Sequence, residues 1–121
     1  MSRIIRIAEM YHHPDSDTDD DALTTTVAGA VLVIPVTHAY VAKTTGGAEA
    51  LTLANGKPGQ ILQITLVAQS GTGTITPATM TGFATIVLTA VGDFCTLLYV
   101  DDTVGWMLLG MGGAAATPVV S

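Results

Sequence analysis

The stretch from Ala48 to Gly110 is divided into short apolar, Thr-rich runs by Gly, Asn-Gly, Pro and Gly-Asp. Gly and Asn tolerate positive φ, and Pro cannot donate to a β-ladder, so these residues mark turns rather than the interiors of regular elements. The apolar residues show no helical period, and the runs between turn signals are too short for ordinary helices. The stretch therefore predicts strands joined by tight turns.

The clearest strand pattern covers residues 60–69, where Leu62, Ile64 and Leu66 fall on one face. Similar patterns predict strands at 24–34, 37–44, 50–53, 74–76, 85–90, 94–101 and 106–111, the last two forming a terminal hairpin around the loop at 102–105. Strands at this spacing are typical of sandwiches and barrels. The predicted fold is all-β, a small β-sandwich or barrel of about 8 short antiparallel strands with an extended N-terminal arm.

A shift in composition divides the chain into three parts. Residues 1–21 form an N-terminal arm and acidic loop, in which Pro14 ends a β-prone segment before a run of Asp. Residues 22–111 form the body of the sandwich or barrel. Residues 112–121 are a tail of mostly small residues, which we expect to be flexible unless a partner holds it.

Low charge indicates a surface that is partly covered by other subunits. Hydrophobic residues make up 49% of the 121 residues and charged residues 12%, with a formal net charge of −6. A typical soluble domain carries about 25% charged residues, and large exposed apolar patches usually mark interfaces. The four basic residues, Arg3, Arg6, Lys43 and Lys57, form no cluster, which argues against direct binding of nucleic acid.

The sequence also argues against a membrane location. Its longest apolar stretch, residues 27–36, contains Gly29 and Pro35 and is shorter than the roughly 20 residues that a spanning helix needs. The N-terminus becomes acidic and polar too early for a signal peptide. We therefore expect synthesis in the cytosol, without export by a cleaved signal.

Asp15, Asp17 and Asp19 are the candidate metal ligands, because alternating carboxylates are used by calcium loops. The pattern then departs from such a loop, with Asp20 where Gly is required and Thr26 where a bidentate Glu belongs. A solvated acidic linker is the favoured interpretation, and no metal or cofactor is predicted.

Histidines offer no second candidate centre. His12 and His13 are adjacent, so in an extended chain their rings point in opposite directions. They are interpreted as a surface pair, and His38, between Thr37 and Ala39, as a strand residue.

No nucleophile lies in a catalytic pattern. Ser70 lacks the G-x-S-x-G elbow, and the glycines at 71 and 73 lack the Lys of a phosphate loop. Cys95, the only cysteine, lies in an apolar run and is predicted to be a buried, inert thiol. The chain is therefore predicted not to be an enzyme. The aromatic residues around Trp106 suit a core or a subunit interface better than a sugar-binding platform.

The order of several landmarks resembles the β-module of tailed-bacteriophage structural proteins, which is found in capsid decoration (cement) proteins and in head- or tail-fibre-like proteins. The resemblance covers roughly half of the chain, and each element alone is a weak motif. The matching landmarks are Ala50-Leu51-Thr52-Leu53, Asn55-Gly56, Gly59-Gln60, Ile64-Thr65-Leu66, Thr74-Ile75-Thr76-Pro77-Ala78, Gly82, Thr85-Ile86, Gly92-Asp93, Leu97 and Trp106.

This resemblance implies a virion structural protein that binds the outside of a phage head as a homotrimer and stabilises contacts between major capsid subunits. The expected partners are the major capsid protein and further copies of the chain. The alternative is a trimeric fibre or spike component, or a carbohydrate-binding module, that recognises a host glycan. The expected interface residues are Ile4, Ile5, Ile7 and Tyr11 in the arm and Trp106 and Met107 in the terminal hairpin. The resemblance does not decide which capsid axis the protein occupies, or whether it forms a trimer or another oligomer.

Overall fold

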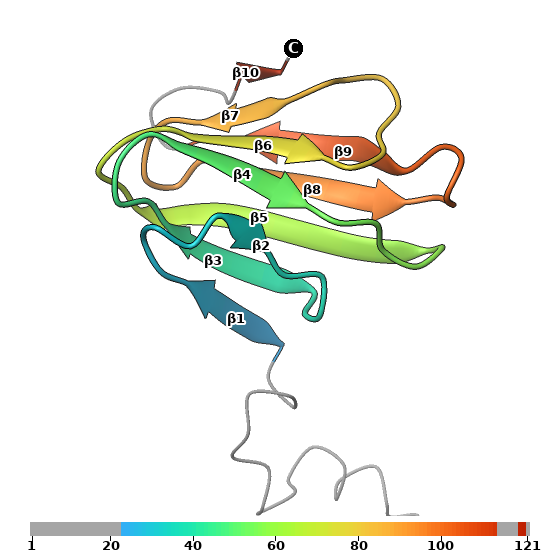
Figure 1. Cartoon of the computed structure of the whole chain (residues 1–121), viewed down its shortest axis with the longest axis horizontal. Coiled ribbons are helices and arrows are strands. Elements are labelled where there is room, and N and C mark those ends of the chain that lie inside the picture. The colour runs from blue at the N-terminus through green and yellow to red at the C-terminus, as the bar shows by residue number, and fades with distance from the viewer. Residues whose placement is uncertain (1–22, 114–118, 121) are drawn as a thin grey trace, which may run out of the picture.

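The structure, a computed structural model, describes residues 23–113 and 119–120. Within these residues the chain is all-β, with two facing five-stranded sheets and no helix (Figure 1). The first sheet has the order β1 (Thr24–Val27), β3 (Tyr40–Thr44), β5 (Gln60–Ala68), β8 (Phe94–Tyr99) and β9 (Trp106–Gly112). The second has the order β2 (Val33–Ile34), β4 (Glu49–Leu53), β6 (Gly73–Pro77), β7 (Ile86–Leu88) and β10 (Val119–Val120). The predicted all-β class and sandwich architecture are confirmed.

The first six strands alternate between the two sheets, so the chain winds as a flattened spiral. β1, β3 and β5 lie side by side in the first sheet, and β2, β4 and β6 do so in the second. All four pairings among these strands are parallel. Parallel neighbours need a crossover connection, and here each crossover is a strand of the opposite sheet.

After β6 the pairing changes to antiparallel. β7 turns back beside β6, β8 crosses to pair with β5, β9 completes a hairpin with β8, and β10 returns to β7. The prediction of antiparallel strands is therefore right for this half of the fold and wrong for the spiral. The pattern of turn residues shows where the chain bends, but it does not tell a hairpin within one sheet from a corner between two sheets.

Two predicted elements differ from the structure. The expected strand at 24–34 is two strands in different sheets, because the chain turns at Gly29 and Ala30, and Ala30 has a φ of 69°. Residues 119–120 lie in the tail, which we expect to be flexible unless a partner holds it, and they pair with β7. His38 precedes β3 in a bend instead of lying in a strand.

The core lies between the sheets and follows the two-residue period of the strands. Leu62, Ile64 and Leu66 of β5 are fully buried, as predicted, and they face side chains from the second sheet. The largest buried side chain is that of Trp106, which packs edge-on against Tyr99 with ring centroids 5.1 Å apart. The remaining members of the core are Val27, Ile34, Val41, Leu51, Leu53, Ile75, Ile86, Leu88, Cys95 and Leu97.

The first corner of the spiral is residues 28–32, the second 45–48 and the third 69–72. These corners are stacked at one end of the sandwich, which is the left-hand end in Figure 1. A Cβ added to Gly71 would lie 2.4 Å from the carbonyl carbon of Gly47, and one added to Gly29 would lie 3.0 Å from the Cα of Gly46. The backbones thus approach closely enough to require glycine. Thr45 ties the second corner to the third by donating from Oγ1 to the Gly71 carbonyl at 2.7 Å.

Candidate functional site

The corners enclose a buried ion pair between Lys43 of β3 and Glu49 of β4. Lys43 Nζ lies 2.9 Å from Glu49 Oε1, and the side chains are 0% and 6% exposed. The ammonium also donates to the carbonyls of Ala28 at 2.9 Å and Val31 at 2.5 Å. Glu49 Oε2 accepts from the amides of Ala30 and Gly46, each at 2.8 Å. The pair therefore joins the first corner to the second.

The surroundings of Glu49 stabilise its charged form. Hydrogen bonds from the Gly46 and Ala30 amides, followed by the contact with Lys43, lower the pKa of the carboxyl from 4.5 to about 2, against the opposing effect of burial. A carboxylate with such a low pKa is a poor general base, and its oxygens already face an ammonium and two amides. This geometry is that of a structural ion pair, and a single-sequence reading of the chain did not identify it. A signal was present in the sequence, because Lys43 lies two residues from Val41 and Glu49 two residues from Leu51, so each charged residue shares a strand face with an apolar one.

Asp93 is a second buried carboxylate, at the turn between β7 and β8. Its Oδ2 accepts from the amide and hydroxyl of Thr89, at 2.9 and 3.2 Å, and from the amide of Ala90 at 3.0 Å. Oδ1 is buried and has no hydrogen-bond partner among the residues that the structure describes. These contacts close the turn in the way that Asp side chains commonly do.

Two other ionisable side chains, those of Cys95 and Tyr99, are buried in the core. Cys95 is buried, as predicted, and burial raises the pKa of its thiol to about 12. Tyr99 donates its hydroxyl to the Asp102 carboxylate. Burial and that carboxylate raise the pKa of Tyr99 to about 12.

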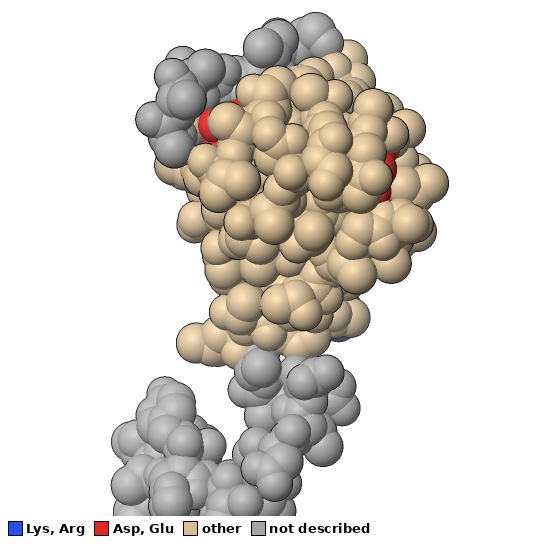
Figure 2. Space-filling model, turned by 90° about the vertical axis from the view of Figure 1, so that its left-hand side faces the viewer, with Lys and Arg blue, Asp and Glu red and all other residues tan. Residues whose placement is uncertain are grey.

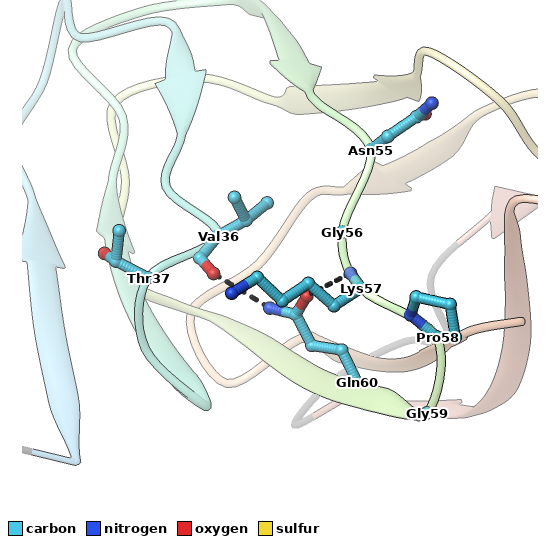
Figure 3. A pocket seen from close by; sticks show the side chains of 8 residues that line it. All are labelled: Val36, Thr37, Asn55, Gly56, Lys57, Pro58, Gly59 and Gln60. Atoms are coloured by element: carbon cyan, nitrogen blue, oxygen red, sulfur yellow. Dashed lines mark hydrogen bonds between the residues drawn. The ribbon is translucent and has the colours of Figure 1, made fainter. Parts of the chain in front are cut away.

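A hollow of about 640 Å³ lies at the opposite end of the spiral from the stacked corners, between the loop preceding β3 and the loop between β4 and β5 (Figure 3). The side-chain amide of Gln60 lies in this hollow and bridges the two loops. It donates to the Val36 carbonyl at 2.8 Å and accepts from the backbone amide of Lys57 at 2.9 Å. Among the described residues the lining has no aromatic side chain, and it consists of Val36, Thr37, Asn55, Gly56, Lys57, Pro58, Gly59 and Gln60.

The outer face of the first sheet carries a row of apolar side chains. The register places Ile61 of β5 opposite Leu98 of β8, and Leu98 opposite Met107 of β9. Ile61 is 45% exposed, Met107 40% and the neighbouring Leu109 55%, while Leu98 is half-buried. We call Ile61, Leu98, Met107 and Leu109 the apolar row.

Exposed charges are confined to one end of the described structure. Of the charged residues in 23–113, Lys43, Glu49 and Asp93 are buried, and the exposed ones are Lys57, Asp101 and Asp102. All three exposed residues lie in the β4–β5 and β8–β9 loops, at the right-hand end in Figure 1. Figure 2 shows that the opposite end is almost entirely uncharged. The outer faces of both sheets are therefore free of charge among the described residues.

The predicted interface residues separate into three groups. Trp106 is fully buried, and its Nε1 donates to the Ala54 carbonyl at 2.9 Å, so it supports the core instead of facing a partner. Met107 is on the surface, within the apolar row. The arm residues Ile4, Ile5, Ile7 and Tyr11 and the candidate metal ligands Asp15, Asp17 and Asp19 lie outside the described residues.

Neither a family model nor a curated protein matches this chain. No group of three or more metal-ligating side chains occurs within the described ranges. The described residues also include no helix long and apolar enough to cross a membrane.

Proposed function

We propose that this chain is a non-enzymatic virion structural protein, a capsid decoration (cement) protein that binds the outside of a bacteriophage head as a homotrimer. The observation that supports it is the apolar row on the uncharged outer face of the first sheet. Uncharged, partly apolar surface of this kind is typical of interfaces. The landmark order described above provides the link to phage particles.

The mechanism under this proposal is mechanical. Burial of the apolar row against other subunits stabilises the shell by about 25 cal/mol for each Å² of apolar surface removed from water. Contacts made by several copies of one oligomer add to one another through multivalency. The stacked corners are joined by hydrogen bonds and an ion pair, which should limit the conformational freedom that is lost on binding.

The hollow gives the glycan-binding alternative a place on the molecule. Sugar recognition commonly uses aromatic stacking, however, and none of the described residues that line the hollow is aromatic. The amide of Gln60 is already occupied by the Val36 carbonyl and the Lys57 amide. The capsid-binding function is therefore the one that the geometry favours.

The test uses co-sedimentation of the purified full chain with empty expanded heads from the phage whose genome encodes it, together with light scattering of the chain alone. Met107→Glu places a charge within the apolar row and should abolish sedimentation with the heads. Thr76→Glu is the matched control, because Thr76 is exposed on the outer face of the second sheet and is expected to leave binding unchanged. Binding of Met107→Glu at the wild-type level, or a monomeric wild-type chain, would contradict the proposal.

A further inference from the structure

The first coil of the spiral consists of β1 and β2, and its outer edge is not paired with any described strand. Each is the outermost described strand on its side, β1 beside β3 and β2 beside β4. Four large apolar side chains are exposed on this coil, with Leu23 80%, Val31 47%, Leu32 44% and Val33 60% exposed. Residues 23–36 contain no charged side chain. Edge strands are normally protected by charge, by a bulge or by a covering segment.

The outer edge of β1 presents backbone amides that can donate to a further strand. The Tyr40 amide donates to the Leu23 carbonyl at 3.3 Å, so the alternation of a parallel ladder turns the amides of Thr24 and Thr26 away from β3. The corner that follows β1 is fixed by Lys43 and Glu49 through the backbone of Ala28, Ala30 and Val31. A fixed edge can accept another strand at little cost in conformational entropy.

We propose that residues 3–8 of the same chain form one more parallel strand on β1 and so cap the spiral. The spacing of the coils allows this occupant. Paired positions in successive coils are separated by 16 residues for Thr24 and Tyr40, 19 for Val33 and Thr52, 23 for Tyr40 and Gln63, and 24 for Glu49 and Gly73. A separation of about 20 residues, within that range, brings residues 5–7 beside residues 25–27.

The residue pattern of the arm agrees with that register. Ile5 falls beside half-buried Thr25, and Ile7 beside buried Val27, so both isoleucines lie on the inner face. Arg6 falls beside exposed Thr26, on the outer face, where its charge stays in water. A slip of one residue would exchange these faces and turn Arg6 inward. Ile5 and Ile7 therefore bind to their own sheet under this proposal, instead of contacting a capsid as the sequence first indicated.

The experiment measures hydrogen exchange of the Thr24 and Thr26 amides by NMR in the full chain. In the wild type we expect exchange at least about 10-fold slower than in the Ile5→Asp and Ile7→Asp variants, because a docked strand accepts hydrogen bonds from both amides. Ile4→Asp is the matched control, since this register places Ile4 on the outer face, and it should retain the protection. The amides of β5 report that each variant remains folded.

Two results would overturn the proposal. Fast exchange of Thr24 and Thr26 in the wild type would show that nothing pairs with this edge. Protection that falls on tenfold dilution would show that the covering strand comes from a second copy of the chain. Protection that is independent of concentration and lost only in Ile5→Asp and Ile7→Asp would support it, whatever the outcome of the capsid-binding test.

Discussion

Acid should weaken this protein through Glu49. The carboxyl is nearly inaccessible to solvent, and its low pKa of about 2 reflects two backbone amides and the Lys43 ammonium that exist as a set only in the folded chain. Protonation of Glu49 removes the negative charge that the two amides and the Lys43 ammonium stabilise. Glu49→Gln imitates the protonated side chain at every pH, so the stability difference between wild type and variant isolates this one group.

The sign and size follow from linkage. Because the folded pKa lies below the ordinary value of 4.5, the stabilisation is fully present above pH 4.5 and is lost as the pH falls toward 2. A fall from 4.5 to about 2 corresponds to about 3 kcal/mol, at about 1.36 kcal/mol for each pKa unit. The free energy of unfolding of a domain is typically about 5–15 kcal/mol, so the effect is large enough to measure.

The assay is urea unfolding of the wild type and of Glu49→Gln, followed by Trp106 fluorescence between about pH 7 and about pH 2. At neutral pH we expect the variant to be less stable by about 3–5 kcal/mol, since it leaves the Lys43 charge buried without its partner. The difference should shrink by about 3 kcal/mol as the pH falls. Asp101→Asn, which removes an exposed carboxylate, should leave this narrowing in place. A difference that stays constant over the whole range would refute the reasoning.

Three further predictions concern the corners and the core. Gly71→Ala should lower the free energy of unfolding in urea by at least about 1–3 kcal/mol, because the new Cβ would overlap the backbone of Gly47. Gly110→Ala is the control and should have little effect, because a Cβ there has no described atom within 4 Å. Cys95 should react with a thiol reagent only at the rate of unfolding, and fast labelling of the native protein would contradict its burial and its raised pKa. Trp106→Phe should lower the free energy of unfolding by about 1–3 kcal/mol, because the Ala54 carbonyl loses its donor, and an unchanged melting curve would argue against that bond.

The sequence was sufficient to predict most of the strands and their buried faces, because a two-residue period is a local property. Leu62, Ile64 and Leu66 illustrate this, since their alternation with polar residues is visible without a structure. Partner choice is not local. The parallel pairing of β3 with β5 depends on corners at residues 45–48 and 54–59 that lead the chain into the opposite sheet, and turn residues alone do not specify that direction.

The site was harder to predict than the fold for a related reason. Trp106 and Met107 are adjacent, so one of them must face the core and the other the solvent, and only the register of β9 against β8 decides which. The apolar row escaped notice because Ile61, Leu98 and Met107 come from three strands and meet only through that register. Lys43 escaped notice because a charged residue is rarely found fully buried.

The buried ion pair also bears on how the chain avoids misfolding. Thr, Val and Ala recur along these strands, and such uniform sequences specify strand alignment only loosely. Lys43 is the exception in β3, and a shift of one residue against β5 would carry its ammonium to the outer face and leave Glu49 buried without a cation. An irregularity in the ladder follows directly, between Lys43 and Thr44. A single charged residue thus penalises a one-residue slip of β3, which the Val and Ala residues beside it would specify only weakly.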